Sequence, residues 1–293
     1  MQELGLGGGR PATPALRVGP EWYRVVVSQF LKKLPDFPRP AAMPEPDAAG
    51  FARTRLGIAL DARQEEVMRS SAKRAILNCS RQWGKSTVAA AKAVHRAYTR
   101  PRSLVLVASP GERQSGEFVR KAAGMLGRLR IRQRGDGDNA ISLLLPNGSR
   151  IVGLPGTEGT VRGFSAVSLL VIDEASRVED SLYKALRPML AVGDGDLWMM
   201  STPWGKRGFF YDTWVHGGPE WLRLEAPATV CERIPRAFLE EERRQLGAWF
   251  EQEYMCRFVD RGAGAFALDL VEEAMDDEEL EMDVEPVWLD ERA

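Results

Sequence analysis

The residues best suited to chemistry form a short run with a glycine, a lysine and two hydroxyl side chains. The run from Ser80 to Thr87 reads SRQWGKST, with Gly84, Lys85 and Ser86 in consecutive positions. Backbone N–H groups at a helix N-terminus, a lysine and a serine hydroxyl can bind nucleotide phosphates and Mg²⁺. The run matches the second half of the pattern G-x-x-x-x-G-K-[ST], and Cys79 stands at the first glycine position. Because a bare GKS triplet is common, an ordinary turn between a strand and a helix is the alternative.

A second candidate element is a pair of acids that follows an apolar run. Residues 168–172 read SLLVI and lead into Asp173 and Glu174. A strand buried on both faces would end there, and ligands of open α/β sheets bind at the carboxyl ends of strands. Asp173 is expected in the Mg²⁺ shell, and Glu174 is expected to orient and deprotonate water. The alternative is an ordinary helix cap with its neighbour.

A third apolar strand, Leu197–Met200, ends in Ser201, Thr202 and Pro203. Hydroxyl groups beside the acidic strand could sense the γ-phosphate or the attacking water. By itself the segment could equally be a strand-to-turn junction.

The elements that must position these residues alternate between strand and helix. A helix over Leu60–Met68 leads into the strand before the loop, and a helix to Tyr98, a strand over Leu104–Ala108 and a helix through Phe118 follow. This alternation predicts a parallel sheet with helices on both faces. Gln64 on the first helix could pair with adenine through its amide, although a solvated helix glutamine is equally compatible.

A row of arginines follows this part of the chain. Their alternation with other residues predicts a strand with the guanidinium groups on one face: Arg128, Arg130, Arg132 and Arg134. Such a face could contact DNA phosphates or simply be solvated. Turn residues at 135–139 and 146–148 predict hairpins and an antiparallel extension of the sheet.

Composition limits the possible functions. The chain has 293 residues and a formal net charge of −1, so DNA contact would require a local basic patch. The three cysteines form no C-x-x-C pair, which argues against a zinc or disulfide framework and is compatible with a reducing cytoplasm. No apolar run is long enough to span a bilayer.

The chain divides into regions of different composition. Residues 1–53 are expected to be a disordered, proline-rich segment with one short helix at Glu21–Leu34, which could dock on a partner or on its own domain. An ATPase core over 54–220, a lid over 221–262 and an acidic tail or linker over 263–293 are expected to follow.

The order of these segments resembles the ATPase part of the large terminase subunit, the motor that packages DNA into phage heads. The matching runs are SRQWGKST, ASPGERQSGEFVRK, GTVRGFSAVSLLVIDEA, MSTPWGKRGFFYDTW and PRAFLEEERRQLGAWFEQEYMCRFVD. The form SRQ-x-GKS, with no leading glycine, is itself a trait of that family. The resemblance implies an ASCE/RecA-like P-loop NTPase fold with a mainly parallel sheet, an antiparallel hairpin extension and a small helical lid that moves with nucleotide.

The resemblance also implies roles for individual residues. ATP would be bound by Gln64, Ser80, Arg81, Gln82, Trp83, Gly84, Lys85, Ser86 and Thr87. Catalysis would use Glu174, Lys85, Arg81 and Arg162, the last as an arginine finger on a neighbouring subunit's nucleotide, with a structural loop arginine as the alternative. Mg²⁺ would be held by Ser86 and Asp173, and Ser201, Thr202 and Pro203 would couple hydrolysis to movement.

The partners implied by the resemblance are double-stranded DNA, the portal protein, the small terminase subunit and further copies in a ring, pentameric on the portal. The location implied is the cytoplasm of an infected or lysogenic bacterium and, transiently, the portal vertex of the procapsid. An RNase H-like nuclease domain would normally follow the ATPase part, so no nuclease activity is expected here, and a separate nuclease chain is one possibility. The alternatives are a superfamily 2 helicase or translocase and a degenerate prophage protein that binds nucleotide or DNA without turnover.

Overall fold

The computed structural model describes residues 47–154, 156 and 163–260. The expected helix at Glu21–Leu34, the acidic tail and Arg162 lie outside these ranges. Within the described ranges, no helix combines the length and the apolar character needed to cross a bilayer.

The centre of the fold is a seven-stranded sheet in the order β3-β4-β2-β5-β6-β1-β7. All pairings are parallel except that of β3 with β4. The strands are β1 (Arg74–Cys79), β2 (Leu104–Ala108), β3 (Ser142–Leu144), β4 (Arg150–Gly153), β5 (Leu169–Asp173), β6 (Asp196–Ser201) and β7 (Trp221–Ala226). The α/β class and the antiparallel extension at the turn 146–148 are therefore confirmed.

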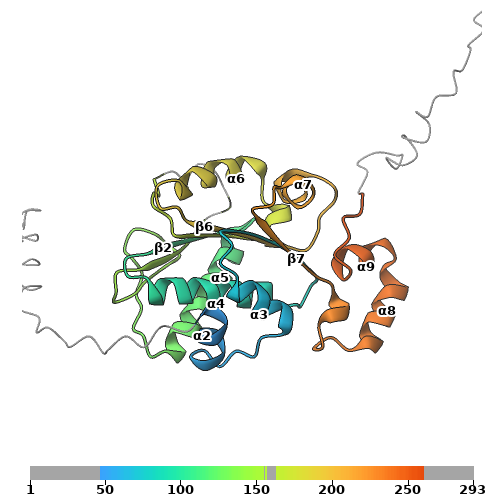
Figure 1. Ribbon diagram of the computed structural model, residues 1–293, viewed down its shortest axis with the longest axis horizontal. Helices are drawn as coiled ribbons and strands as arrows, with labels where there is room; N and C mark the ends of the chain where they lie inside the picture. Colours follow the sequence, from blue (N-terminus) through green and yellow to red (C-terminus); the bar gives the residue numbers. More distant parts are fainter. Residues whose placement is uncertain (1–46, 155, 157–162, 261–293) are drawn as a thin grey trace, which may run out of the picture. The chain divides into compact units, whose positions relative to one another are not determined.

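Helices cover both faces of this sheet, as Figure 1 shows. One face packs on α2 (Ala48–Thr54), α3 (Ala62–Arg69), α4 (Lys85–Thr99) and α5 (Glu112–Arg128), and the other on α6 (Asp180–Leu186) and α7 (Gly208–His216). Neighbouring strand residues alternate between the two cores: Ala75 and Leu77 belong to the first, and Ile76 to the second. Burial on both faces explains the continuous apolar runs in the sequence.

The strand order determines which residues meet. β6 pairs with β1 on one side and with β5 on the other, in parallel. Asn78 of β1 lies opposite Ser201, and Asp173 of β5 lies opposite Met200. The carboxyl ends of these three strands therefore lie side by side at one edge of the sheet.

The predicted arginine strand is wrong. Helix α5 continues to Arg128, because Ala122, Met125 and Leu126 keep the buried helical spacing beyond Phe118. The helix ends in a Schellman motif: Arg130 has φ 56°, its N–H donates to Gly127 O, and the Ile131 N–H donates to Leu126 O.

The arginines after α5 consequently share no strand face. Arg128 Nη1 donates to Leu56 O at 2.8 Å, and only Arg134 forms an isolated bridge, with Leu144. The alternating letters therefore come from a helix end and a loop.

Two region boundaries also differ from expectation. Residues 221–226 form β7, a parallel edge strand on β1, so the helical lid begins only after it. The lid comprises a 3₁₀ turn, η4 (Ala228–Val230), and the helices α8 (Arg236–Leu246) and α9 (Ala248–Glu253). At the other end, α2 buries Phe51 against the core, so the packed domain begins before residue 54.

Candidate active site

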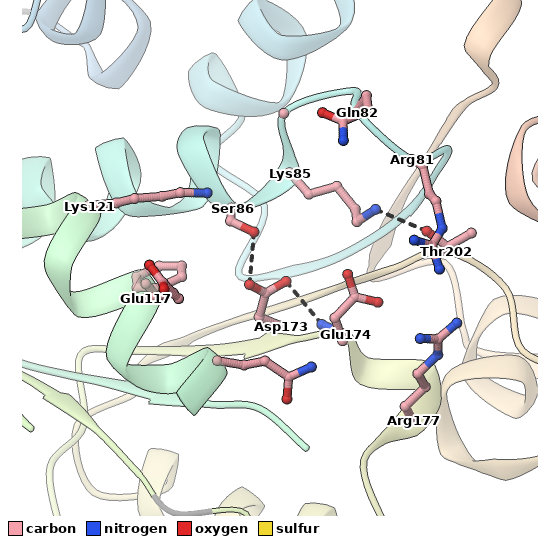
Figure 2. A pocket seen from close by; sticks show the side chains of 13 residues that line it. Arg81, Gln82, Lys85, Ser86, Glu117, Lys121, Asp173, Glu174, Arg177 and Thr202 are labelled. Carbon is pink, nitrogen blue, oxygen red and sulfur yellow. Dashed lines mark hydrogen bonds between the residues drawn. The ribbon is translucent and has the colours of Figure 1, made fainter. Parts of the chain in front are cut away.

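A cleft of about 420 Å³ opens at the carboxyl ends of β1, β5 and β6, where the loop, the acids and the hydroxyl segment meet (Figure 2). Its walls come from the phosphate-binding loop, from the β5 and β6 ends and from one face of α5. The lining residues are Arg81, Gln82, Gly84, Lys85, Ser86, Gln114, Glu117, Phe118, Lys121, Asp173, Glu174, Arg177 and Thr202.

The loop from Ser80 to Gly84 turns the chain from β1 into α4. Gly84 caps α4 with φ 99°, a left-handed conformation that favours glycine, and Gln82 also has a positive φ of 61°. The Trp83 side chain is fully buried in the core below the loop. The loop is thus anchored from below, while Arg81 and Gln82 remain exposed in the cleft.

Lys85 is the first residue of α4, and its side chain is largely buried. Its Nζ donates to Ser80 O at 3.2 Å and to Thr202 Oγ1 at 3.0 Å. These acceptors hold the ammonium group at the floor of the cleft, between the loop and the end of β6 (Figure 2).

Ser86 and Asp173 face each other across the cleft. Ser86 Oγ donates to Asp173 Oδ2 at 2.9 Å, and the Glu174 N–H donates to Asp173 Oδ1 at 3.0 Å. Burial raises the pKa of the Asp173 carboxyl, and the charge of Glu174 raises it further, although the Ser86 hydrogen bond and the Lys85 charge oppose this.

This pair fits a Mg²⁺ ion. A hydroxyl and a carboxylate oxygen are hard ligands, and Mg²⁺ usually keeps several waters and few protein ligands. The cation would also offset the cost of ionising the buried Asp173. Among the described residues, no group of three or more His, Cys, Asp and Glu side chains offers a larger cage.

Glu174 lies between Asp173 and the Arg81–Arg177 side of the cleft (Figure 2). Its backbone is in the left-handed region, with φ 51° and ψ 42°, at the turn from β5 into the 3₁₀ helix η2 (Ala175–Arg177). This strained conformation, unusual for a residue with a side chain, directs a carboxylate into the cleft beside the metal-binding pair.

The segment after β6 contributes one of its three expected residues to the cleft wall. Thr202 lines the cleft, whereas Ser201 and Pro203 are buried behind it. Ser176 Oγ lies 2.6 Å from Ser201 Oγ and donates to Thr202 O at 2.7 Å. The hydroxyl segment is therefore hydrogen-bonded to the turn that follows Glu174.

Gln64 lies beside the loop but does not line the cleft. Its Nε2 donates to Trp83 O at 2.8 Å, and its Oε1 accepts from the Asp61 N–H at 3.1 Å in the capping box of α3. Arg233 Nη2 donates to the same Trp83 carbonyl at 2.6 Å. In this conformation the amide of Gln64 braces the loop, and a role toward adenine stays a prediction.

Two groups in the cleft were missed by the sequence analysis. On α5, Gln114, Glu117 and Lys121 recur at helical spacing along the cleft wall, a pattern that could have been recognised. The second group, Arg177 with Glu253, had no sequence signal, because these residues are far apart in the chain.

Arg81 and Arg177 share one acidic partner, Glu253 at the end of α9. Arg81 Nε bonds to Glu253 Oε2, and Arg177 Nη2 lies 3.6 Å from Glu253 Oε1. The guanidinium of Arg177 also stacks on Trp204, 4.2 Å from the ring centroid. The lid thus contributes a buried carboxylate to the edge of the cleft.

Comparison with known proteins agrees with this geometry. Residues 76–273 match the family model described as the terminase large subunit, T4likevirus-type, N-terminal. A terminase large subunit of Thermus virus P23-45 is 25% identical over 246 residues, covering 71% of this chain and 50% of the relative. A second, from Thermus phage G20c, is 25% identical over 251 residues with the same coverage. The chain spans about half the length of the curated relatives it matches.

Solved structures show the same fold. The large terminase ATPase domain of Thermus phage P74-26 has a TM-score of 0.63 and 24% identity, over 71% of this chain and 97% of that one. The large terminase of another thermophilic bacteriophage, in complex with ADP, has a TM-score of 0.58 and 16% identity, over 69% of this chain and 54% of that one.

Proposed function

Because the chain belongs to the terminase large subunit family, we propose that it binds ATP with Mg²⁺ and hydrolyses it to drive double-stranded DNA into a procapsid. One observation carries the proposal: the 2.9 Å hydrogen bond from Ser86 to Asp173 in the cleft that also holds Lys85 and Glu174. This combination has the parts that phosphoryl transfer requires, namely a phosphate-binding lysine, a metal pair and a base.

Nucleotide binding would use groups that already have acceptors in the cleft. Lys85 Nζ exchanges its hydrogen bonds to Ser80 O and Thr202 Oγ1 for β- and γ-phosphate oxygens. Ser86 Oγ and Asp173 hold the Mg²⁺ ion, which when bound neutralises phosphate charge. Gln64, on the helix beside the loop, is the candidate for adenine once its present hydrogen bonds are exchanged.

Hydrolysis would then depend on Glu174 and the arginines around it. The Glu174 carboxylate orients a water for in-line attack on the γ-phosphate and accepts its proton, so that ADP and inorganic phosphate are released. Arg81 stabilises the charge on the transferring phosphoryl group. Thr202, joined through its carbonyl to Ser176, passes the change at the γ-phosphate to the turn after Glu174.

Arg162 stays a proposal as the trans-acting arginine, six residues before Ser168 at the start of the acidic segment. A guanidinium delivered by a neighbouring subunit would complete the charge stabilisation and make turnover depend on assembly. The partners proposed are further copies in a ring, the portal protein and the small terminase subunit, with action in the host cytoplasm and at the portal vertex.

A basic end of the domain is the proposed DNA contact. Arg100 and Arg102 follow α4, and Arg130 and Arg132 follow α5, all exposed. Asn147 joins these elements, because its Nδ2 donates to Ala97 O and its carbonyl accepts from the Arg102 N–H. No described acidic side chain lies within 4.0 Å of these arginines, so they are available to duplex phosphates.

The same end is continuous with α2. Arg55 Nη2 donates to the hydroxyl of Tyr98 on α4, and Arg128 Nη1 donates to Leu56 O. These contacts bring the ends of three helices together at the edge of the sheet opposite the cleft. A helicase of superfamily 2, the nearest enzyme alternative, is not favoured by the family match.

ATP turnover per subunit, measured against protein concentration, tests the function. Wild-type protein should hydrolyse ATP with Mg²⁺, while Glu174→Gln should bind ATP without measurable turnover. A rate that rises with concentration and collapses in Arg162→Ala would support assembly in trans. Turnover equal to that of Glu174→Gln at every concentration, with and without linear DNA, would contradict the hydrolase proposal.

A further inference from the structure

The buried carboxylate of Glu253 is an unexpected part of the cleft. Glu253 ends α9 in the lid, and its side chain is only 6% exposed, whereas its partners Arg81 and Arg177 are 55% and 30% exposed. A buried carboxylate is costly unless it is paired, and here both of its oxygens face guanidinium groups. Gln252 Nε2 donates to Oε1 at 3.2 Å as well.

The two arginines face the same place in the cleft. Arg81 extends from the loop and Arg177 from the turn after Glu174, and their guanidinium groups lie on the same side of the cleft (Figure 2). Both groups have donors of the kind that bind phosphate oxygens. In the nucleotide-free protein these donors are directed to Glu253 instead, and the partnership with Glu253 raises the pKa of Arg81.

The lid segment around Glu253 is also hydrogen-bonded to the loop through its backbone. The Arg81 N–H donates to Glu253 O at 3.0 Å, and the Ser80 N–H donates to Ala226 O at 2.9 Å. The Ala228 N–H donates to Tyr254 O at 2.7 Å, which ties the start of the lid to its end. A change at Arg81 therefore reaches α9 directly.

We propose that Glu253 is a positioning residue that competes with nucleotide phosphate for Arg81 and Arg177. In the empty site its carboxylate occupies their donors, as γ-phosphate oxygens would in the ATP complex. When ATP binds, the phosphate takes over these donors and Glu253 loses its partners, so the end of α9 is released. The inference rests on the proposed nucleotide binding and assigns the lid a part in it.

The competition predicts the sign of a mutational effect. Glu253→Gln keeps the size of the side chain but removes its charge, so the arginines are no longer held away from phosphate. Binding of ATP should become about three- to tenfold tighter, the range expected from losing one charge-assisted pair at a partly exposed site. A residue that merely supported the fold would instead weaken binding or leave it unchanged when altered.

The experiment is equilibrium titration of the whole chain with mant-ATP and mant-ADP in the presence of Mg²⁺. Glu251→Gln is the matched control, because it makes the same change on the same helix at a residue paired with Arg243. Tighter mant-ATP binding in Glu253→Gln, a smaller gain for mant-ADP and no change in Glu251→Gln are expected. In an Arg81→Gln background, the gain from Glu253→Gln should shrink.

The outcomes separate the inference from the function on which it rests. Mant-ATP binding in Glu253→Gln that equals or falls below wild type overturns the role of Glu253 and leaves the ATP site standing. Wild-type protein that binds no mant-ATP overturns both. If Glu253→Gln does not fold, hydrogen exchange of the wild type replaces it: added ATP-γ-S should speed exchange of the α9 amides, and unchanged or slower exchange overturns the inference.

Discussion

Ser86 and Asp173 are 87 residues apart in the sequence and joined by a 2.9 Å hydrogen bond from Oγ to Oδ2. The bond connects the first turn of α4 to the last residue of β5, so it reports directly on the correct alignment of loop and acid. Because Asp173 is buried, this alignment concentrates negative charge where the protein itself supplies little solvation.

Asp173→Asn should therefore stabilise the protein while abolishing hydrolysis. The pKa of Asp173 is raised in the folded state, so folding disfavours its ionised form and its stabilising contribution is lost as pH rises through that pKa. At pH 8 without Mg²⁺, the variant should be more stable by about 1 kcal/mol, or roughly 2–4 °C in unfolding temperature.

Differential scanning fluorimetry at pH 8 and pH 3, with EDTA, measures this effect. The difference should vanish at the lower pH, where the wild-type carboxyl is protonated in both states. A variant less stable than wild type at pH 8 would mean that the Ser86 and Glu174 hydrogen bonds outweigh the charge penalty.

Lys85→Ala should reduce ATP affinity by about a hundredfold. The variant removes the ammonium group that now bonds to Ser80 O and Thr202 Oγ1, and charged hydrogen bonds contribute about 1.5–3 kcal/mol each. Isothermal titration calorimetry with ATP and Mg²⁺ measures the loss. Lys184→Ala, which removes an exposed lysine of α6, serves as the control. Equal affinity in both variants would remove Lys85 from the phosphate site.

Replacing Arg130 and Arg132 together by glutamine should flatten the salt dependence of DNA binding. Each phosphate contact contributes a slope of about 0.9 in a plot of log K against log salt for duplex DNA, so two lost contacts lower it by about 2. Fluorescence anisotropy with a labelled duplex at several KCl concentrations gives the slope. Arg236→Gln, an exposed arginine of the lid, is the control, and an unaltered slope in the double variant would exclude this face.

Asp136→Asn should destabilise the protein at neutral pH by about 1 kcal/mol, a figure reduced for solvent screening. Burial opposes ionisation of Asp136, but hydrogen bonds from Asn139, Ser142 and Asp138 outweigh it and lower the pKa to about 2. The stabilisation is present above the unfolded-state pKa and is lost as pH falls through about 2.

Urea unfolding between pH 7 and pH 2 measures this difference, which should shrink in the acid range. Asp138→Asn alters an exposed carboxyl in the same turn and should have little effect. A gap between wild type and Asp136→Asn that stays constant down to pH 2 would show that the lost interaction is not electrostatic.

The sequence predicted the parts of the site that consist of contiguous residues. A glycine before a lysine and a serine, and two acids after an apolar run, indicate their local structure, because backbone conformation and burial act over a few residues. The elements that carry Lys85, Asp173 and Thr202 were therefore predicted within a residue or two. Their meeting at one edge followed from the parallel sheet.

The contacts that depend on distant segments were not predictable in this way. Arg177 and Glu253 meet only because the chain returns from α9 to the loop, which no local pattern encodes. The arginine strand failed for a different reason. Period-two alternation over a few residues also fits a helix end followed by a loop, and the buried positions of α5 that decide between them lie upstream of the arginines.

The hydrogen bond between Ala228 and Tyr254 means that the lid leaves and re-enters the sheet domain at one point. A segment with adjoining ends can be lengthened, shortened or exchanged without shifting the strands on either side, as in domains that accept insertions. In this fold α8 and α9 therefore form a replaceable cassette. Evolution, or an engineer, could change the lever length of such a machine while the cleft that holds Lys85 and Glu174 stays unchanged.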